Sequence, residues 1–226
     1  MVKMLPTEES KLELIQNEMI GLGRVVLASN QQILAALEEC QPCKLDDISK
    51  IKKHERYEKI DEIDDLIIKF FALYTPEAKD LRLLIAFLKM TNEFDRIANS
   101  CNSFIRDFPQ ALSDEVDKDF ILEYAIPLQK TSVAALTGAL NLIALDDKER
   151  VHAEYKNVVV EEAKNDDLYQ IIEKNLLTKI NDNIMLSQDY QDIMQALRRL
   201  EKVADRALSI ASLMHYAKLG GVITKT

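Results

Sequence analysis

The strongest chemical signal in this sequence is the pairing of acidic residues four positions apart. Glu201 and Asp205 form one such pair, and Glu162 and Asp166 form another. In a helix, residues four apart lie one turn apart on the same face, so each pair presents two carboxylates together. Clustered carboxylates repel one another unless a cation neutralises them, and their oxygens suit Mg²⁺, Ca²⁺, Mn²⁺ or iron. The pairs predict a cation site if their helices pack side by side. The simpler alternative is a solvated helix surface, because the chain has 38 acidic residues.

The acidic motifs recur within the chain. The segment 95–99 (DRIAN) resembles 201–205 (EKVAD), in which an acid, a base, an aliphatic residue and Ala precede a carboxylate or its amide. The offset is 201 − 95 = 106 residues. Upstream, the segment 63–66 (IDDL) resembles 165–168 (NDDL), at an offset of 166 − 64 = 102. Two matches in the same order predict the duplication of one structural unit.

Long helices are expected to carry these motifs. The chain has 226 residues, 47% of them hydrophobic, but only 5 Gly and 5 Pro, which is too few turn residues for a many-stranded sandwich or barrel. Apolar residues recur at steps of three and four, which predicts amphipathic helices. Six are expected, over about 12–42, 46–74, 76–108, 113–145 with a kink at Pro127, 148–180 and 187–219. The prediction is an all-α protein of two tandem three-helix bundles related by internal pseudo-symmetry, with repeats at 1–110 and 111–226.

Composition and charge restrict the classes of binding partner and the cellular compartment that we expect for this protein. The formal charge is −9 and the pI is near 5.0, which argues against nucleic-acid binding through clustered Lys and Arg. The first residues lack the apolar core of a signal peptide, and the longest charge-free run (131–145) is too short to span a bilayer. The lone Cys40-Gln41-Pro42-Cys43 motif has no second pair and is interpreted as a chance spacing. We expect a cytoplasmic protein.

Together these motifs resemble those of the PhoU family, the regulators of bacterial phosphate uptake. The similarity is clearest over 63–76, at Asp80-Leu81-Arg82 and at Asp95-Arg96-Ile97 in the first half. In the second half it covers Glu162 and Asp166 and the run 200–205. The resemblance implies two pseudo-symmetric three-helix bundles and no catalytic activity. It also implies a cytoplasmic homodimer that reaches the membrane only through its partners, the ATPase of the phosphate ABC transporter and the phosphate sensor histidine kinase. The kinase is held inactive when phosphate is plentiful.

The resemblance further implies that acid-xxx-Asp motifs bind a divalent or ferric metal ion, namely Fe, Zn or Mg. The residues carried over are Asp64, Asp95, Glu162, Asp166, Glu201 and Asp205. Two departures affect the first half, where Asn99 replaces an Asp and Ile60 replaces an acid, although Asp61 could substitute for one ligand. Lys202 replaces an Arg in the second half. We therefore predict an intact metal site in the second half and a weakened or metal-free one in the first.

Three other interpretations stay open at this point. A di-iron ferritin-like protein needs an ExxH from each of two helices, and this chain has only Glu149-Arg150-Val151-His152. A histidine phosphotransfer module needs an exposed His, for which His54 is the candidate. His215 is expected to be a packed residue near a helix end. The last alternative is a helical interaction scaffold that binds no metal.

Overall fold

The structure is a computed structural model that describes residues 7–39, 44–45, 48 and 50–220. Its long elements are α1 (Glu8–Glu38), α2 (Lys53–Leu73), α3 (Ala78–Ala111), α4 (Lys118–Ala144), α5 (Lys148–Asp182) and α6 (Ser187–Leu219), with the short 3₁₀ helix η2 (Ile184–Leu186) before α6. No strand occurs among the described residues. The predicted all-α class is confirmed.

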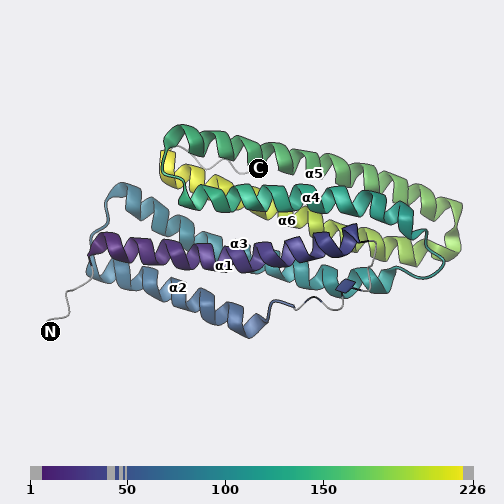
Figure 1. The fold of residues 1–226 in the computed structure, drawn as a ribbon, viewed down its shortest axis with the longest axis horizontal. Coiled ribbons are helices and arrows are strands. Elements are labelled where there is room, and N and C mark those ends of the chain that lie inside the picture. Colours follow the sequence, from purple (N-terminus) through teal and green to yellow (C-terminus); the bar gives the residue numbers. More distant parts are fainter. Residues whose placement is uncertain (1–6, 40–43, 46–47, 49, 221–226) are drawn as a thin grey trace.

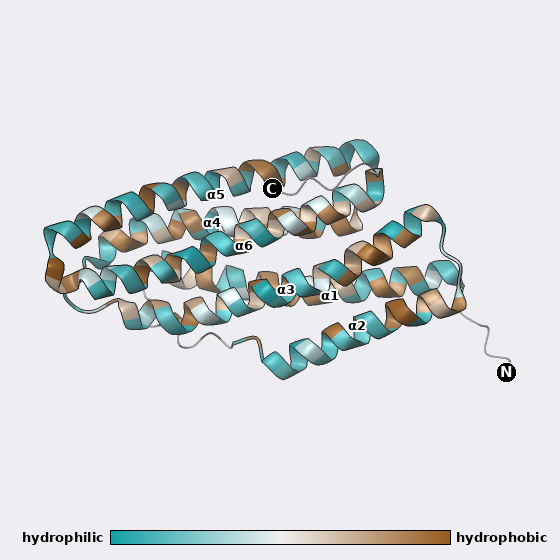
Figure 2. Cartoon of the chain, turned by 180° about the vertical axis from the view of Figure 1, so that it is seen from behind, coloured by the Kyte–Doolittle hydropathy of each residue, from teal (hydrophilic) through white to brown (hydrophobic). Residues whose placement is uncertain are grey.

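The six helices run lengthwise through the molecule, with α4, α5 and α6 on one side and α1, α2 and α3 on the other (Figure 1). The two sets are joined by α3 packing along α6 and α1 packing along α4. Apolar and polar residues alternate around each helix, as expected for helices with one buried face (Figure 2). The buried residues form one continuous core that includes Phe87, Phe94 and Phe104 of α3. This core holds the helices in a definite register, on which the sites described below depend.

Burial along the helices follows the internal duplication. All ten buried residues of α1, from Ile15 to Leu37, fall on buried residues of α4 when they are shifted by 106. The same shift places twelve of the fourteen buried residues of α3 on buried residues of α6. For α2 and α5 the matching shift is 102, which places four of five buried residues on buried ones. Equivalent positions in the two halves can therefore be compared directly. The division at 110/111 stays a prediction, and it falls at the last turn of α3.

The ends of two helices in the first half differ from the sequence-based expectation. The second helix begins at Lys53 rather than near residue 46, and Asp46-Asp47 lie outside the described residues. The third begins at Ala78 with Glu77 as its N-cap, so Thr75 is not the cap. It also continues through Pro109 to Ala111. Pro109 has no N–H to donate to the carbonyl four residues earlier, and α3 ends two residues after it.

The fourth helix begins at Lys118 and not at Ser113, so that expectation was wrong. Asp117 is the N-cap, and its Oδ1 accepts a hydrogen bond from the backbone N–H of Phe120 at 3.1 Å. The hydroxyl of Ser113 instead donates to Asp189 Oδ2 at 2.6 Å. Pro127 lies inside α4. The remaining helices start and end close to the predicted positions.

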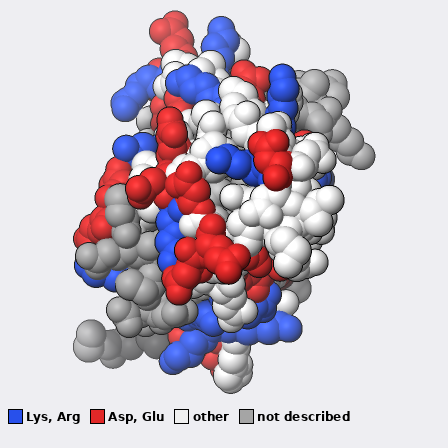
Figure 3. All heavy atoms as spheres, turned by 90° about the vertical axis from the view of Figure 1, so that its right-hand side faces the viewer, with Lys and Arg blue, Asp and Glu red and all other residues white. Residues whose placement is uncertain are grey.

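The surface is strongly charged. The end of the molecule seen in Figure 3 carries groups of Asp and Glu side chains with Lys and Arg between them. Of the helices described here, none combines the length and the apolar character needed to cross a bilayer. The Cys40-Gln41-Pro42-Cys43 motif lies outside the described residues, whereas Cys101 is buried and burial raises the pKa of its thiol to about 12.

Candidate metal centre

The two acidic pairs of the second half meet between α5 and α6. Glu162 and Asp166 lie on α5, Glu201 and Asp205 lie on α6, and the two helices pack against each other. One carboxylate oxygen each from Glu162, Asp166 and Asp205 lies within 4.8 Å of the other two. Such a spacing allows one cation to contact all three. We call these four residues the acidic site.

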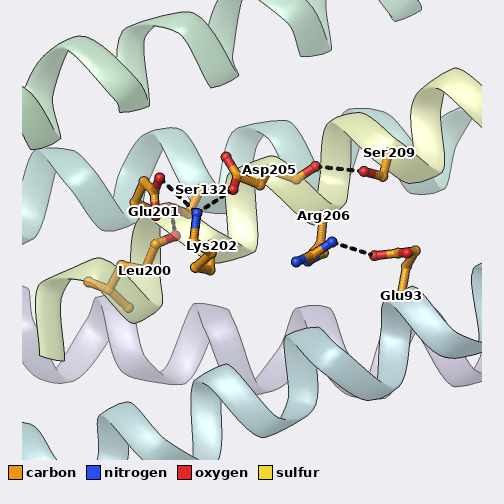
Figure 4. A network of polar contacts seen from close by, with 8 residues as sticks. All are labelled: Glu93, Ser132, Leu200, Glu201, Lys202, Asp205, Arg206 and Ser209. Atoms are coloured by element: carbon orange, nitrogen blue, oxygen red, sulfur yellow. Dashed lines mark hydrogen bonds and ion pairs between the residues drawn. The ribbon is translucent and has the colours of Figure 1, made fainter. Parts of the chain in front are cut away.

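Lys202 supplies a positive charge at the acidic site. Its Nζ donates to Asp205 Oδ2 at 2.7 Å and to Glu201 Oε1 at 3.1 Å, so the ammonium lies between the two α6 carboxylates (Figure 4). Burial lowers and these two acids raise the pKa of Lys202, and the net shift is upward. The lysine therefore stays charged at neutral pH. A metal ion bound to both α6 carboxylates would take over a neutralising role that Lys202 now fills.

The charges of the acidic site remain only partly neutralised by this lysine. Burial, followed by the charges of Asp166, Asp205 and Glu201, raises the pKa of Glu162 to about 7. Burial and Asp205 also raise the pKa of Asp166, and the same two causes raise that of Glu201. A raised pKa means that the charged form of these carboxylates is unfavourable where they lie, so a cation bound among them would stabilise that form.

A buried oxygen in the acidic site also fits a cation. Glu201 Oε2 is buried and has no hydrogen-bond partner among the described residues, which is costly for a carboxylate oxygen. The other oxygen of the same side chain is held by Lys202. An oxygen-rich set of three or four carboxylates suits Mg²⁺, iron or Mn²⁺, and carboxylate oxygens also bind Zn²⁺. The residues present therefore fit the predicted ion.

Buried polar contacts hold the backbone on which the acidic site is built. Asn165, next to Asp166, donates from Nδ2 to the backbone oxygen of Leu128 at 2.8 Å and to Ser132 Oγ at 2.9 Å. Ser132 Oγ in turn donates to the backbone oxygen of Leu200, next to Glu201, at 2.9 Å (Figure 4). This network ties α4, α5 and α6 together beside the carboxylates. Sequence reasoning missed it, because its members are far apart in the chain.

The corresponding place in the first half has a different composition. The shifts found above align Ile60 with Glu162, Asp64 with Asp166, Asp95 with Glu201 and Asn99 with Asp205. Two of the four carboxylates are therefore missing. Burial, then the charge of Asp61, raises the pKa of Asp64, and Asp64 lies beside Thr91.

Arg56 provides a cation in this first-half site. It aligns with Val158, and its side chain is only 1% exposed. Its Nε donates to Asp95 Oδ1 at 2.7 Å and its Nη2 donates to Asn99 Oδ1 at 2.9 Å. Asn99 Nδ2 completes the group by donating to Asp95 Oδ2 at 3.0 Å. The guanidinium occupies the position where a cation would neutralise Asp95, and sequence spacing could not reveal it because Arg56 is 39 residues away from Asp95.

The histidines lie outside both sites. His54 is exposed on α2, with its Nε2 3.4 Å from Glu58 Oε1. His152, the last residue of the single ExxH motif, lies near the start of α5 and contacts His215 of α6. The ExxH histidine therefore does not join the four carboxylates.

Comparison with known proteins finds a family match within the first half of the chain. Residues 20–107 match the family description "PhoU domain". The predicted resemblance to the PhoU family is confirmed by this match together with the shared fold described next.

Two solved structures share the fold over nearly the whole chain. PhoU from Pseudomonas aeruginosa is 20% identical, with a TM-score of 0.80, and the alignment covers 95% of this chain and 100% of that one. The phosphate transport system regulatory protein PhoU from Streptococcus pneumoniae is 18% identical, also with a TM-score of 0.80, covering 97% and 100%. No protein of curated function matches the sequence. The shared fold therefore extends beyond the matched residues 20–107 to α4, α5 and α6.

Proposed function

We propose that this chain is a regulator of phosphate transport that works by binding other proteins rather than by catalysis. The observation that carries the proposal is the match of residues 20–107 to the PhoU domain, supported by the full-length fold shared with a phosphate transport regulatory protein. Its partners in this proposal are the ATPase of the phosphate ABC transporter and the phosphate sensor histidine kinase. It acts in the cytoplasm as a homodimer and reaches the membrane only through these partners.

The proposed regulation is a shift in the population of kinase states. A bound regulator changes kinase activity only if it binds the inactive state more tightly than the active one. Holding a kinase that is half active at 99% inactive requires about a hundredfold difference in affinity, or about 2.7 kcal/mol. An adaptor of this kind needs a rigid binding surface and no reacting groups, and long helices around a continuous core provide such a surface.

The second part of the proposal is a metal ion, Fe, Zn or Mg, held by Glu162, Asp166, Glu201 and Asp205. Support comes from the spacing of the carboxylates, the raised pKa of Glu162 and the unpartnered Oε2 of Glu201. Such an ion would join α5 to α6. Lys202 is expected to release at least one of its two carboxylates when the ion binds.

The first-half site is proposed to hold no metal. Asp64 and Asp95 are the remaining carboxylates, and Asp95 is already neutralised by Arg56. The two halves are then equivalent in shape but different in chemistry. One half is joined by an exchangeable ion and the other by a guanidinium that is part of the chain.

Metal analysis of matched variants tests the assignment of the two sites. Purified full-length protein, Glu201→Ala and Asp95→Ala are loaded with Fe²⁺, Zn²⁺ or Mg²⁺ and dialysed, and the bound metal is measured by mass spectrometry. We expect Glu201→Ala to lose the metal and Asp95→Ala to keep it. Equal losses in both variants would refute the asymmetry, and no metal in the wild type would favour the metal-free scaffold. Oxygen consumption on addition of Fe²⁺ would favour the ferritin-like alternative.

A second experiment tests the regulatory role. Pulldown of the tagged chain from phosphate-replete and phosphate-starved cells should recover the transporter ATPase and the sensor kinase, with more kinase recovered when phosphate is plentiful. Sedimentation of the purified protein reports the oligomeric state. Recovery of neither partner under either condition would reject the adaptor proposal and leave the metal proposal intact.

A further inference from the structure

Two histidines face each other across the contact between α5 and α6. His152 Nδ1 and His215 Nε2 are 3.2 Å apart, although the residues are 63 positions apart in the sequence. His152 is exposed and His215 is half-buried. The pair is therefore accessible from solvent while lying at the contact between two packed helices.

The separation of the two nitrogens suits a metal ion as well as a hydrogen bond. Imidazole nitrogens bind Zn²⁺ at about 2.0–2.1 Å, and two such ligands in a tetrahedral shell are about 3.3 Å apart. The observed distance is close to this value without any movement of the helices. Burial, then the neighbouring His152, lowers the pKa of His215, which favours the neutral form of the ring that binds metal ions.

Neighbouring residues hold and complete the pair. The ring of Tyr155 stacks on that of His215, with centroids 4.4 Å apart and an angle of 29° between the planes. This stacking restricts the rotation of the His215 ring. Glu149 is exposed and lies three residues before His152, so it occupies the same face of α5 and can offer a carboxylate as a third ligand. Glu149 and His152 are the acid and the histidine of the ExxH motif, and neither belongs to the acidic site.

The histidine pair lies on the same helix contact as the acidic site. It is 162 − 152 = 10 residues from Glu162 along α5 and 215 − 205 = 10 residues from Asp205 along α6. Ten residues of α-helix span about 15 Å. Equal steps along both helices are what an antiparallel pair requires. The histidine pair and the acidic site therefore lie at two positions along the same contact between α5 and α6.

We propose that His152 and His215 form a second metal site, which takes a transition-metal ion such as Zn²⁺, Cu²⁺ or Ni²⁺ and connects the start of α5 to the end of α6. Imidazole prefers these ions, whereas Mg²⁺ prefers oxygen ligands. The nitrogen site and the acidic site therefore differ in the ions they select. This inference does not depend on the proposed role in phosphate transport.

Copper and zinc binding to the full-length protein tests the site. Metal-free protein receives one equivalent of Cu²⁺, and the electron paramagnetic resonance spectrum is recorded for the wild type, His152→Gln and His215→Gln. We expect nitrogen hyperfine splitting in the wild type and its loss in both variants, together with at least a tenfold weaker Zn²⁺ affinity. The matched control is His54→Gln, which removes the remaining histidine of the chain and should leave both signals unchanged.

Further measurements separate this site from the acidic site and from a folding defect. Glu201→Ala should retain the copper–nitrogen signal, so that a failure of the acidic site leaves this test intact. If a histidine variant does not fold, unmodified protein labelled with ¹⁵N-histidine decides, because Zn²⁺ must then shift the ring nitrogens of two of the three histidines. A copper spectrum without nitrogen splitting, or shifts confined to His54, would overturn the proposal.

Discussion

Replacing Arg56 by methionine should destabilise the protein far more than the same replacement of an exposed arginine that makes an equally short ion pair. Arg56 is 1% exposed, and its Nε lies 2.7 Å from Asp95 Oδ1, whose side chain is 18% exposed. Methionine keeps most of the apolar stem but removes the charge, so Asp95 is left without a counter-ion. Removing one partner of a buried pair costs roughly 3–5 kcal/mol. Because Asp95 is slightly exposed and keeps the donor Asn99, we expect about 3 kcal/mol.

Arg106 is the matched control for this prediction. It lies on α3 and its Nε is 2.6 Å from Asp107 Oδ1, but its side chain is 57% exposed. An exposed pair contributes about 0–1 kcal/mol. Arg106→Met should therefore lower the free energy of unfolding by less than about 1 kcal/mol. The two ion pairs differ in burial, whereas their Nε–Oδ1 distances are almost the same.

The assay is thermal and urea unfolding followed by circular dichroism. For a chain of this length, about 3 kcal/mol corresponds to a fall in Tm of roughly 6–12 °C for Arg56→Met. The double variant Arg56→Met/Asp95→Asn leaves no unpaired charge, so it should recover most of the loss and show a coupling of about 2 kcal/mol. Equal losses for Arg56→Met and Arg106→Met, or additive losses in the double variant, would refute the idea that a guanidinium neutralises the first-half site.

Four further predictions concern the described packing and charges. Gly21→Ala should raise the free energy of unfolding by about 0.5–1 kcal/mol, because a Cβ there meets no atom within 4 Å and alanine favours the helix. Gly23→Ala should lower it by about 1–2 kcal/mol in the same urea titration, because its Cβ would lie 2.2 Å from Leu140 Cδ2, and no loss would contradict the tight packing. In EDTA, unfolding should become easier as pH rises from 5 to 8, because folding raises the pKa of Glu162 from 4.5 to about 7. Between these two values the folded state keeps a proton that the unfolded state has lost, and this stabilisation is gone once the pH exceeds the folded pKa. Glu162→Gln should flatten this dependence in urea titrations at each pH, and an unchanged slope would argue against repulsion at the acidic site. Asn165→Ala should cost about 1–3 kcal/mol in thermal unfolding, since it leaves the buried backbone oxygen of Leu128 without this donor, and a stability equal to wild type would show that the network is dispensable.

The sequence alone was sufficient for the helical class, the internal duplication and the acidic pairs of the second half. These features depend on spacing along one helix, and a period of 3.6 residues can be read without knowing what the helix packs against. The same reasoning was less successful at helix ends. Ser113 and Asp117 both suit an N-cap position, and tertiary contacts decided between them, since Ser113 bonds to Asp189 while Asp117 caps α4.

The tertiary structure decided which charged side chains meet. Arg56 reaches Asp95, and His152 reaches His215, only because antiparallel helices pack in one particular register around the continuous core. Register is a property of a pair of helices, whereas sequence spacing describes one helix at a time. For this reason the sequence could indicate that the first-half site had lost two carboxylates, but only the packed helices place a guanidinium beside the aspartate that remains.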